Sequence, residues 1–198
     1  MRLILTTLFF ITFTGFAQIK TPAASTSSKL KQTVGLTDID IEYNRPSKKG
    51  RTIFGNLVPF GKKWRTGANS STKISFSTDV KISGSTIKNG TYSVFSIPNE
   101  NEWNVILYSD AELWGVPRDW DENKIIFQSN FKVNKIIAGN EIETFTISIN
   151  NITNNNADLI FAWDDTYVKV RIDVPTSQIV DASIQEVMGG TPKATDYY

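Results

Sequence analysis

The chain has 198 residues, no cysteine and no histidine, and its 21 Lys and Arg side chains nearly balance its 20 Asp and Glu side chains. Without cysteine, disulfides, thiol nucleophiles and thiolate-bound zinc or iron–sulfur sites are excluded. Without histidine, a Ser-His triad, an imidazole base and a His-bound metal are excluded. No motif specifies a reaction, so the sequence identifies no catalytic residue, and we expect no cofactor and no metal site.

Residues 1–17 have the pattern of a signal peptide. One positive charge, an apolar run over residues 3–13 and two small residues, Gly15 and Ala17, precede Gln18. Signal peptidases prefer this order, whereas a membrane-spanning helix needs ~20 apolar residues, about twice the length of this run. We expect cleavage near Ala17, no transmembrane anchor after cleavage, and a periplasmic or extracellular location. An exported chain without disulfides is typical of a bacterial envelope.

Residues 18–29 are small and polar, which predicts a flexible leader. From Leu30 onward, polar and apolar residues alternate, as in Asp38–Tyr43, where three acids alternate with Ile, Ile and Tyr. This period of two is typical of half-buried strands. Further strand segments lie at residues 73–77, 80–82, 85–88, 91–97, 103–108, 125–133, 141–149, 159–163 and 167–174. Short strands with no helices between them predict a single antiparallel β-sandwich, jelly-roll-like, over residues 30–174.

Two turn signals stand out between these strands. Asn-Gly tolerates positive φ at both central positions of a type I′ turn, so Asn89-Gly90 predicts a hairpin between residues 85–88 and 91–97. Asp164-Asp165 predicts a turn before the last strand.

Only residues 175–198 have a helical pattern, which predicts a short C-terminal helix followed by a tail. Thr176 or Ser177 can cap this helix, and Gly189-Gly190 ends it. Its apolar stripe, which we expect to pack on the sandwich, comprises Ile179, Val180, Ile184 and Val187.

The nearly neutral total charge conceals a strong segregation. From Tyr43 to Thr78 there are eight basic residues and no acid. The Gly and Pro content of this stretch predicts a long structured loop, and such loops tend to carry function. Within it, Trp64–Asn69 offers a planar ring, a guanidinium, a hydroxyl, an amide and a glycine, a set that suits a carboxylate, a phosphate or a sugar. The candidate ligand-binding residues are Arg45, Lys49, Arg51, Trp64, Arg65, Thr66 and Asn69.

The opposite charge gathers in residues 100–122, which contain seven acids and one basic residue. Asp119, Asp121 and Asn123 have the alternate spacing of a calcium loop, but its central glycine and its terminal bidentate glutamate are missing. Two carboxylates from residues 110–122 could also serve a glycosidase.

The basic stretch also resembles a known family. Arg45-Pro46, the segment from Leu57 to Gly61 and above all the run Trp64–Asn69 are similar to the domain-of-unknown-function family 2911 of exported Bacteroidetes proteins. The similarity continues to about residue 174. This resemblance implies an exported all-β domain of unknown activity, and it supplies no catalytic residues.

Three interpretations therefore stay open. The first is an exported protein that binds a small anionic or carbohydrate-like ligand, or an envelope component, through the basic loop. The second is a carboxylate-based hydrolase of glycans that uses residues 110–122. The third is a purely structural interaction module, in which Trp64 and Arg65 only brace the fold and the basic residues form a solvated rim that pairs with the acidic segment. Nucleic acid is not an expected partner, because the chain is neutral overall and has the pattern of an exported protein.

Overall fold

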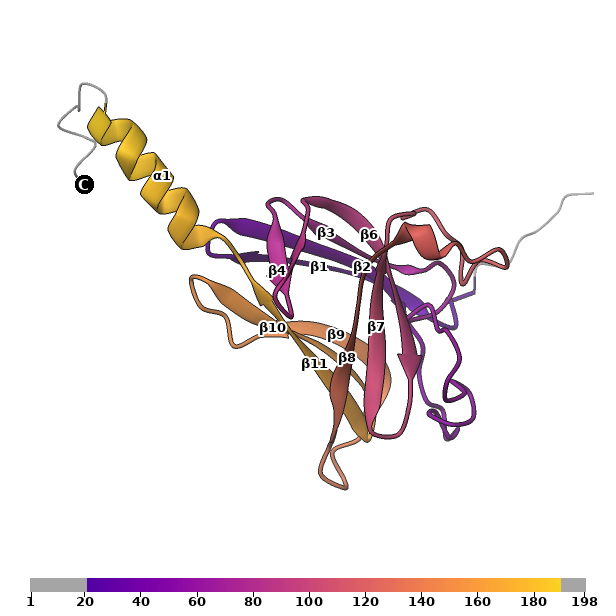
Figure 1. Ribbon diagram of the computed structural model, residues 1–198. Helices are drawn as coiled ribbons and strands as arrows, with labels where there is room; N and C mark the ends of the chain where they lie inside the picture. The colour runs from indigo at the N-terminus through magenta and orange to yellow at the C-terminus, as the bar shows by residue number, and fades with distance from the viewer. Residues whose placement is uncertain (1–20, 190–198) are drawn as a thin grey trace, which may run out of the picture.

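The computed structural model describes residues 21–189, so the predicted signal peptide at residues 1–17 lies outside the described residues. The ribbon shows a curved sheet from which one helix projects (Figure 1). In chain order the elements are β1 (Thr26–Val34), β2 (Thr37–Arg45), β3 (Thr72–Phe76), β4 (Val80–Ile82), β5 (Ser85–Ile87), β6 (Gly90–Pro98), β7 (Glu102–Tyr108), η1 (Glu122–Lys124), β8 (Ile125–Lys135), β9 (Ile142–Asn150), β10 (Asn156–Asp164), β11 (Thr166–Asp173) and α1 (Thr176–Gly189). The predicted all-β class with antiparallel pairing and a short C-terminal helix is confirmed.

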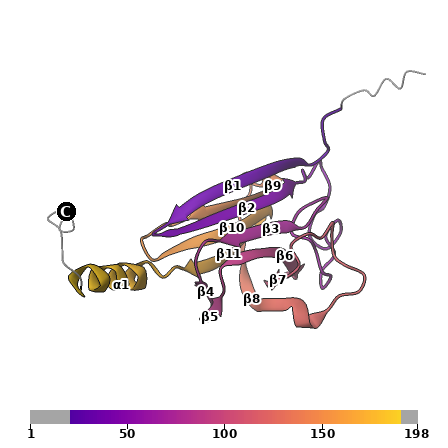
Figure 2. The ribbon, with the colours of Figure 1, turned by 90° about the horizontal axis from the view of Figure 1, so that it is seen from above.

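The strands follow one path in the order β1-β2-β3-β6-β7-β8-β11-β10-β9, and the β4–β5 hairpin is attached to β11. β8 joins the two halves of the sheet, because its first part pairs with β7 and its last three residues pair with β11. The sheet then curls until the chain after β2 meets β9. There, Phe145 N donates to Pro46 O (2.9 Å), and Ser47 and Thr144 form an isolated antiparallel β-bridge. The sheet is thus nearly closed as a barrel, and Figure 2 shows β9 and β10 behind β1 and β2.

The main core lies between the two curved halves of the sheet. In β2, Ile39, Ile41 and Tyr43 are buried, while the acids that alternate with them stay partly or fully exposed. β11 contributes three buried apolar residues and one buried threonine with the same spacing. Successive side chains of a strand point to opposite faces, so the alternation predicted from the sequence directly produces this one-sided core.

A second, smaller apolar cluster lies on the outer face of β6 and β7. Phe95, Ile106 and Tyr108 are buried there, on the face opposite to the main core. Trp120 covers them, with its ring centroid 4.5 Å from that of Tyr108 and 5.2 Å from that of Phe95. The acidic segment at residues 110–122 is therefore folded down onto the sheet by its own apolar residues.

The predicted hairpin at Asn89-Gly90 is wrong. β5 pairs with β4, and the hairpin turn lies at Ser83-Gly84, where both residues have positive φ (48° and 81°). β6 pairs instead with β3 and β7. Asn89 N donates to the Asp79 carboxylate (2.9 Å), so Asn89-Gly90 forms a corner that is held by a side chain. The Asn-Gly pair does specify a sharp turn, but longer-range pairing decides which strands it separates.

The predicted flexible leader is too long. β1 begins at Thr26, so residues 26–29 form part of a strand, whereas residues 21–25 have no regular secondary structure. These polar residues are accommodated because β1 pairs on one side only, with β2. One of its exposed side chains, Lys29, lies 2.6 Å from Glu42 of β2.

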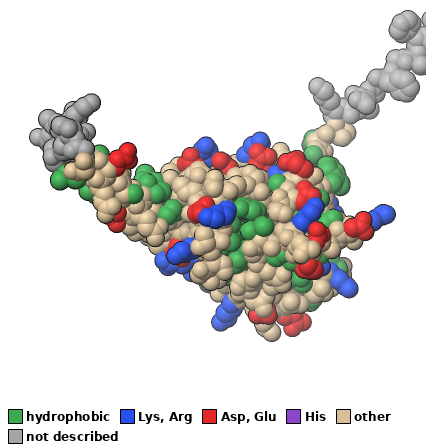
Figure 3. Space-filling view, turned by 45° about the horizontal axis from the view of Figure 1, so that its top comes forward, with side chains coloured by type: hydrophobic (Ala, Val, Ile, Leu, Met, Phe, Trp, Pro, Cys, Tyr) green, Lys and Arg blue, Asp and Glu red, His purple; other side chains and the backbone are tan. Residues whose placement is uncertain are grey.

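The prediction that the C-terminal helix packs on the sheet is also wrong. The chain leaves β11 at Pro175, and α1 stands away from the sheet with no buried residue (Figures 1 and 3). Its apolar residues Val180, Ile184 and Met188 are exposed. No helix within residues 21–189 combines the length and the apolarity that crossing a membrane requires.

Candidate functional site

Residues 46–71 connect β2 to β3 and form a long structured loop. Ile53 and Val58 are buried and anchor its middle, where Val58 N donates to Ile53 O (2.9 Å). Trp64 and Ser96 exchange two backbone hydrogen bonds of 2.7 and 2.9 Å, which anchor its last third to β6. Because the loop is fixed at these points, the side chains that it carries have defined positions.

Two tryptophans form the floor of the candidate site. The rings of Trp64 and of Trp163 in β10 are nearly parallel, with centroids 6.0 Å apart. Both indole N–H groups are satisfied, since Trp64 Nε1 donates to Gly67 O (2.9 Å) and Trp163 Nε1 donates to Glu143 O (3.1 Å). Trp163 is buried, so the ring surface of the floor comes from the partly exposed Trp64, and neither indole leaves a free donor. The other rings of this cluster belong to Phe54, Trp103 and Phe145.

A pocket of about 620 Å³ opens above this floor, and we call it the cationic pocket. Leu57 and Val58 add apolar surface to its lining, while Lys49, Arg51 and Arg65 add three positive charges. No Asp or Glu lines it, and none of the three cations forms an ion pair within residues 21–189. The pocket thus carries uncompensated positive charge beside apolar surface, an environment that attracts an anionic group.

The turn at Lys49-Gly50 places the first of these cations. Both residues have positive φ (48° and 70°), and Lys49 N donates to the Glu143 carboxylate (2.8 Å). The backbone is therefore held while the side chain is exposed. Within the described part of the chain, the Lys49 ammonium has no hydrogen-bond or ion-pair partner.

Arg51 and Arg65 use part of their guanidinium groups to hold the loop. Arg51 donates from Nε and Nη2 to two carbonyls of its own turn, at 3.0 and 2.6 Å. Arg65 donates from Nη1 to Asn69 O (2.5 Å) and to Trp114 O (3.2 Å). A guanidinium has five N–H donors, so each arginine keeps donors that a ligand can use.

The cationic pocket brings together five of the seven predicted ligand-binding residues, namely Lys49, Arg51, Trp64, Arg65 and Asn69. Arg45 and Thr66 do not line it. Arg45 donates to Phe145 O (3.0 Å) and to Thr146 Oγ1 (2.7 Å), which fastens the end of β2 to β9. Thr66 is fully buried, with its hydroxyl 3.0 Å from Ser96 Oγ. These two residues support the loop, and the proposed site below leaves them out.

A family model described as "Protein of unknown function (DUF2911)" matches residues 25–172. The chain belongs to this family. The DUF2911 region extends from β1 to β11, so it contains the whole loop of the cationic pocket and leaves out α1. No curated protein and no solved structure matches the chain.

Sequence reasoning missed Trp163, which comes from outside the basic stretch, and did not single out Leu57 and Val58, which lie within it. Trp163 lies about a hundred residues after Trp64 in the DUF2911 region and carries no local sign of a binding role. It reaches the pocket because the curled sheet brings the end of β10 under the loop. Leu57 and Val58 are in the basic stretch itself, but apolar residues there are equally typical of core.

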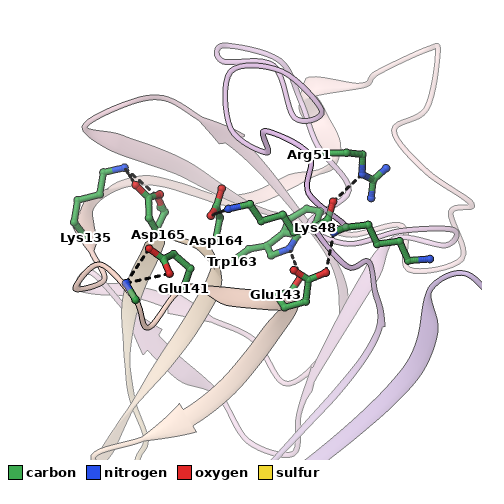
Figure 4. Close-up of polar contacts among 11 residues, drawn as sticks. Lys48, Arg51, Lys135, Glu141, Glu143, Trp163, Asp164 and Asp165 are labelled. Carbon is green, nitrogen blue, oxygen red and sulfur yellow. Dashed lines mark hydrogen bonds and ion pairs between the residues drawn. The ribbon is translucent and has the colours of Figure 1, made fainter.

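Charged residues beside the pocket fasten three segments of the DUF2911 region together (Figure 4). Lys48 forms a hydrogen-bonded ion pair with Asp164, which raises the pKa of Lys48. Lys135 lies 2.9 Å from Asp165. Burial acts to raise the pKa of Asp165, but hydrogen bonds from Lys135 and Thr166 outweigh it and the pKa is lowered. These pairs hold the loop after β2 and the end of β8 against the predicted β10–β11 turn, which is confirmed at Asp164.

The acids at residues 110–122 of the DUF2911 region do not line the cationic pocket. Asp110 and Glu112 form ion pairs with lysines at 3.3 and 2.7 Å, and Asp121 accepts the backbone N–H of Asn123 at η1 (3.0 Å). These three acids therefore have structural partners. Across residues 21–189, no three Asp or Glu side chains gather in a way that could hold a metal ion.

Proposed function

We propose that this protein is an exported β-sandwich that binds a small anionic ligand in the cationic pocket and does not transform it. The ligand combines an apolar, flat body with a carboxylate, phosphate or sulfonate group. The body lies against the exposed part of Trp64, which the buried Trp163 supports, and the anionic group lies among Lys49, Arg51 and Arg65.

One observation carries this proposal: three cations without a carboxylate line the same pocket as the partly exposed ring of Trp64, which stacks on the buried Trp163. Ion pairs with protein carboxylates would offset these charges, as they do for Lys48 and Lys73. Export is inferred from the sequence of residues 1–17 alone.

The most direct test removes the charge of Lys49, the pocket cation whose charged group has no partner within the described residues. The probes are the fluorescent dye anilinonaphthalene sulfonate and its uncharged analogue phenylnaphthylamine. We expect the wild-type protein to bind the sulfonate dye, and Lys49→Gln to weaken this binding roughly three- to tenfold, because one charge contact is lost. Binding of the uncharged dye should not change.

Lys132→Gln is the matched control, because Lys132 is an exposed lysine of β8 that does not line the pocket. This variant should bind both dyes like the wild type. Equal binding of the sulfonate dye by Lys49→Gln and the wild type would contradict the proposal, as would an equal loss in the two variants.

A further inference from the structure

A second concave surface, the Trp114 groove, lies on the outer face of the sheet beside the cationic pocket. It has a volume of about 300 Å³, and it is lined by the start of β1, the end of β2, the start of β3 and the segment at residues 112–114. It shares no lining residue with the cationic pocket. The two sites are adjacent, because Arg65 of the cationic pocket donates from Nη1 to the carbonyl oxygen of Trp114 in the groove (3.2 Å).

The side chain of Trp114 is the unusual feature of this groove, because 75% of this large apolar residue is exposed. Its backbone is nevertheless fixed. Arg65 holds the Trp114 carbonyl, and the carbonyl of the preceding residue, Leu113, accepts two hydrogen bonds of 3.0 Å from the N–H and the hydroxyl of Ser71. An exposed indole on a backbone that is held in place offers a stacking surface.

The polar side chains of the groove are balanced in charge. Lys29 and Glu42 are cross-strand neighbours and lie 2.6 Å apart, and Lys73, which is opposite Glu42 on β3, lies 2.7 Å from Glu112. The groove therefore has two positive and two negative groups, in contrast to the uncompensated cations next to it. Asn44 also lines the groove; its Nδ2 donates to Ser70 Oγ (3.2 Å) and its Oδ1 accepts from Asn69 Nδ2 (3.5 Å), which leaves one N–H and one lone pair of the amide for a ligand.

We propose that the Trp114 groove binds a neutral carbohydrate. A sugar ring presents apolar C–H groups on one face, which stack on the exposed indole of Trp114. Its hydroxyls donate and accept hydrogen bonds at the same time, so they match a wall that offers ammonium, carboxylate and amide groups together. A small anion would find no net positive charge here. Protein partners bind wider apolar patches around a tryptophan. The neighbours of Trp114 in the groove are instead mostly hydroxyl-bearing and charged side chains.

Affinity electrophoresis tests this proposal in gels that contain one neutral polysaccharide at a time: hydroxyethyl cellulose, xyloglucan, laminarin, mannan or amylopectin. We expect at least one of them to retard the wild-type protein, with retardation unchanged when salt is raised to about 0.5 M, because screening acts on charged ligands and hardly on neutral ones. Trp114→Ala should weaken binding by about tenfold or more, as for a central aromatic contact.

Ile137→Ala is the matched control, because Ile137 is exposed to a similar extent (78%) and lies in the β8–β9 turn, outside the groove. Both variants should keep the melting temperature of the wild type, since both side chains are exposed. No retardation of the wild type by any of the five polysaccharides overturns the proposal, and so does equal retardation of Trp114→Ala and the wild type. The dye experiment above reports on the other pocket, so either proposal can fail alone.

Discussion

Arg65 lies between the two concave surfaces and contacts the backbone of both. Its Nη1 joins Asn69 O in the loop of the cationic pocket to Trp114 O beside the groove. The guanidinium also lies close to Gly115, where a Cβ atom would approach its Cζ to 3.0 Å. A side chain that we predicted to bind ligand therefore also braces two loops, so the binding and the structural interpretations of this residue are compatible.

This bracing role predicts a loss of stability. Arg65→Ala should lower the free energy of unfolding by about 1–2 kcal/mol, because two hydrogen bonds from a charged donor, one to each loop, are lost. Urea unfolding followed by tryptophan fluorescence measures this change. Arg118→Ala, at an exposed arginine without a bond in the described chain, should stay within about 0.5 kcal/mol of the wild type. A stable Arg65→Ala protein would show that Arg65 does not brace the loops.

Residues that lie close together in the sequence could be predicted as parts of one site, but residues that meet through folding could not. Lys49, Arg51 and Trp64 occur within one acid-free stretch and converge on one pocket. Trp163 joins them only through the strand register of β10 and β9. Arg45 is as basic as its neighbours, and nothing local shows that β9 occupies its guanidinium.

The turn between β1 and β2 leaves no room for a Cβ atom at its glycine. Gly35, in the turn between β1 and β2, has φ +56°, and an added Cβ would overlap Thr176 at the start of α1 and the backbone oxygen of Asn154. Leu36 N in the same turn donates to Thr176 Oγ1 (3.3 Å). This turn therefore holds the junction between β11 and α1.

Gly35→Ala should destabilise the protein by about 2–4 kcal/mol, because the left-handed backbone strain adds to an overlap with backbone that cannot move away easily. Gly139→Ala is the matched control. Gly139 has φ +89°, but an added Cβ would have no atom within 4 Å. Alanine at this position should therefore cost only the left-handed backbone strain of about 1 kcal/mol. Thermal or urea unfolding compares the two variants. Equal losses would mean that the turn does not pack tightly against the start of α1.

Strands could be predicted from the sequence because each has one buried face, which imposes the alternation of residues. Pairing could not be predicted with the same success. Asn89-Gly90 has the composition of a hairpin turn, yet β5 pairs across Ser83-Gly84. Likewise, the apolar stripe of α1 is real, but a periodic stripe does not show that a surface is available to cover it.

At the scale of the whole molecule, charge is interspersed over the surface, as Figure 3 shows for one face, and several carboxylates are held in ionised form. A hydrogen bond from Lys88 and one from Asn89 N lower the pKa of Asp79. Hydrogen bonds from Gly139 N lower the pKa of Glu141, and Asp165 is affected in the same direction. In each case the pKa is lower in the folded than in the unfolded chain.

Acid should therefore destabilise the fold. As the pH falls below about 5, the unfolded chain takes up protons at these carboxyl groups before the folded chain does, so the free energy of unfolding decreases down to the lowered pKa values. Urea unfolding at a series of pH values between about 6 and 2.5 measures the slope. Asp79→Asn should make the slope shallower. Asp119→Asn, at an exposed aspartate without a bond in the described chain, serves as the control, and equal slopes in the two variants would contradict the role of Asp79.

The position of β11 has a consequence for how the molecule can be made. β11 is the last strand in the chain, but it lies inside the sheet, between β8 and β10, and also holds the β4–β5 hairpin. β11 supplies the pairing that joins β8 to β10, so the ladder from β1 to β9 is continuous only when β11 is in place. During synthesis, the chain lacks this central strand until residues 166–173 have been made. The complete sheet therefore forms only late, and an N-terminal fragment that ends before β11 should lack the pairing between β8 and β10.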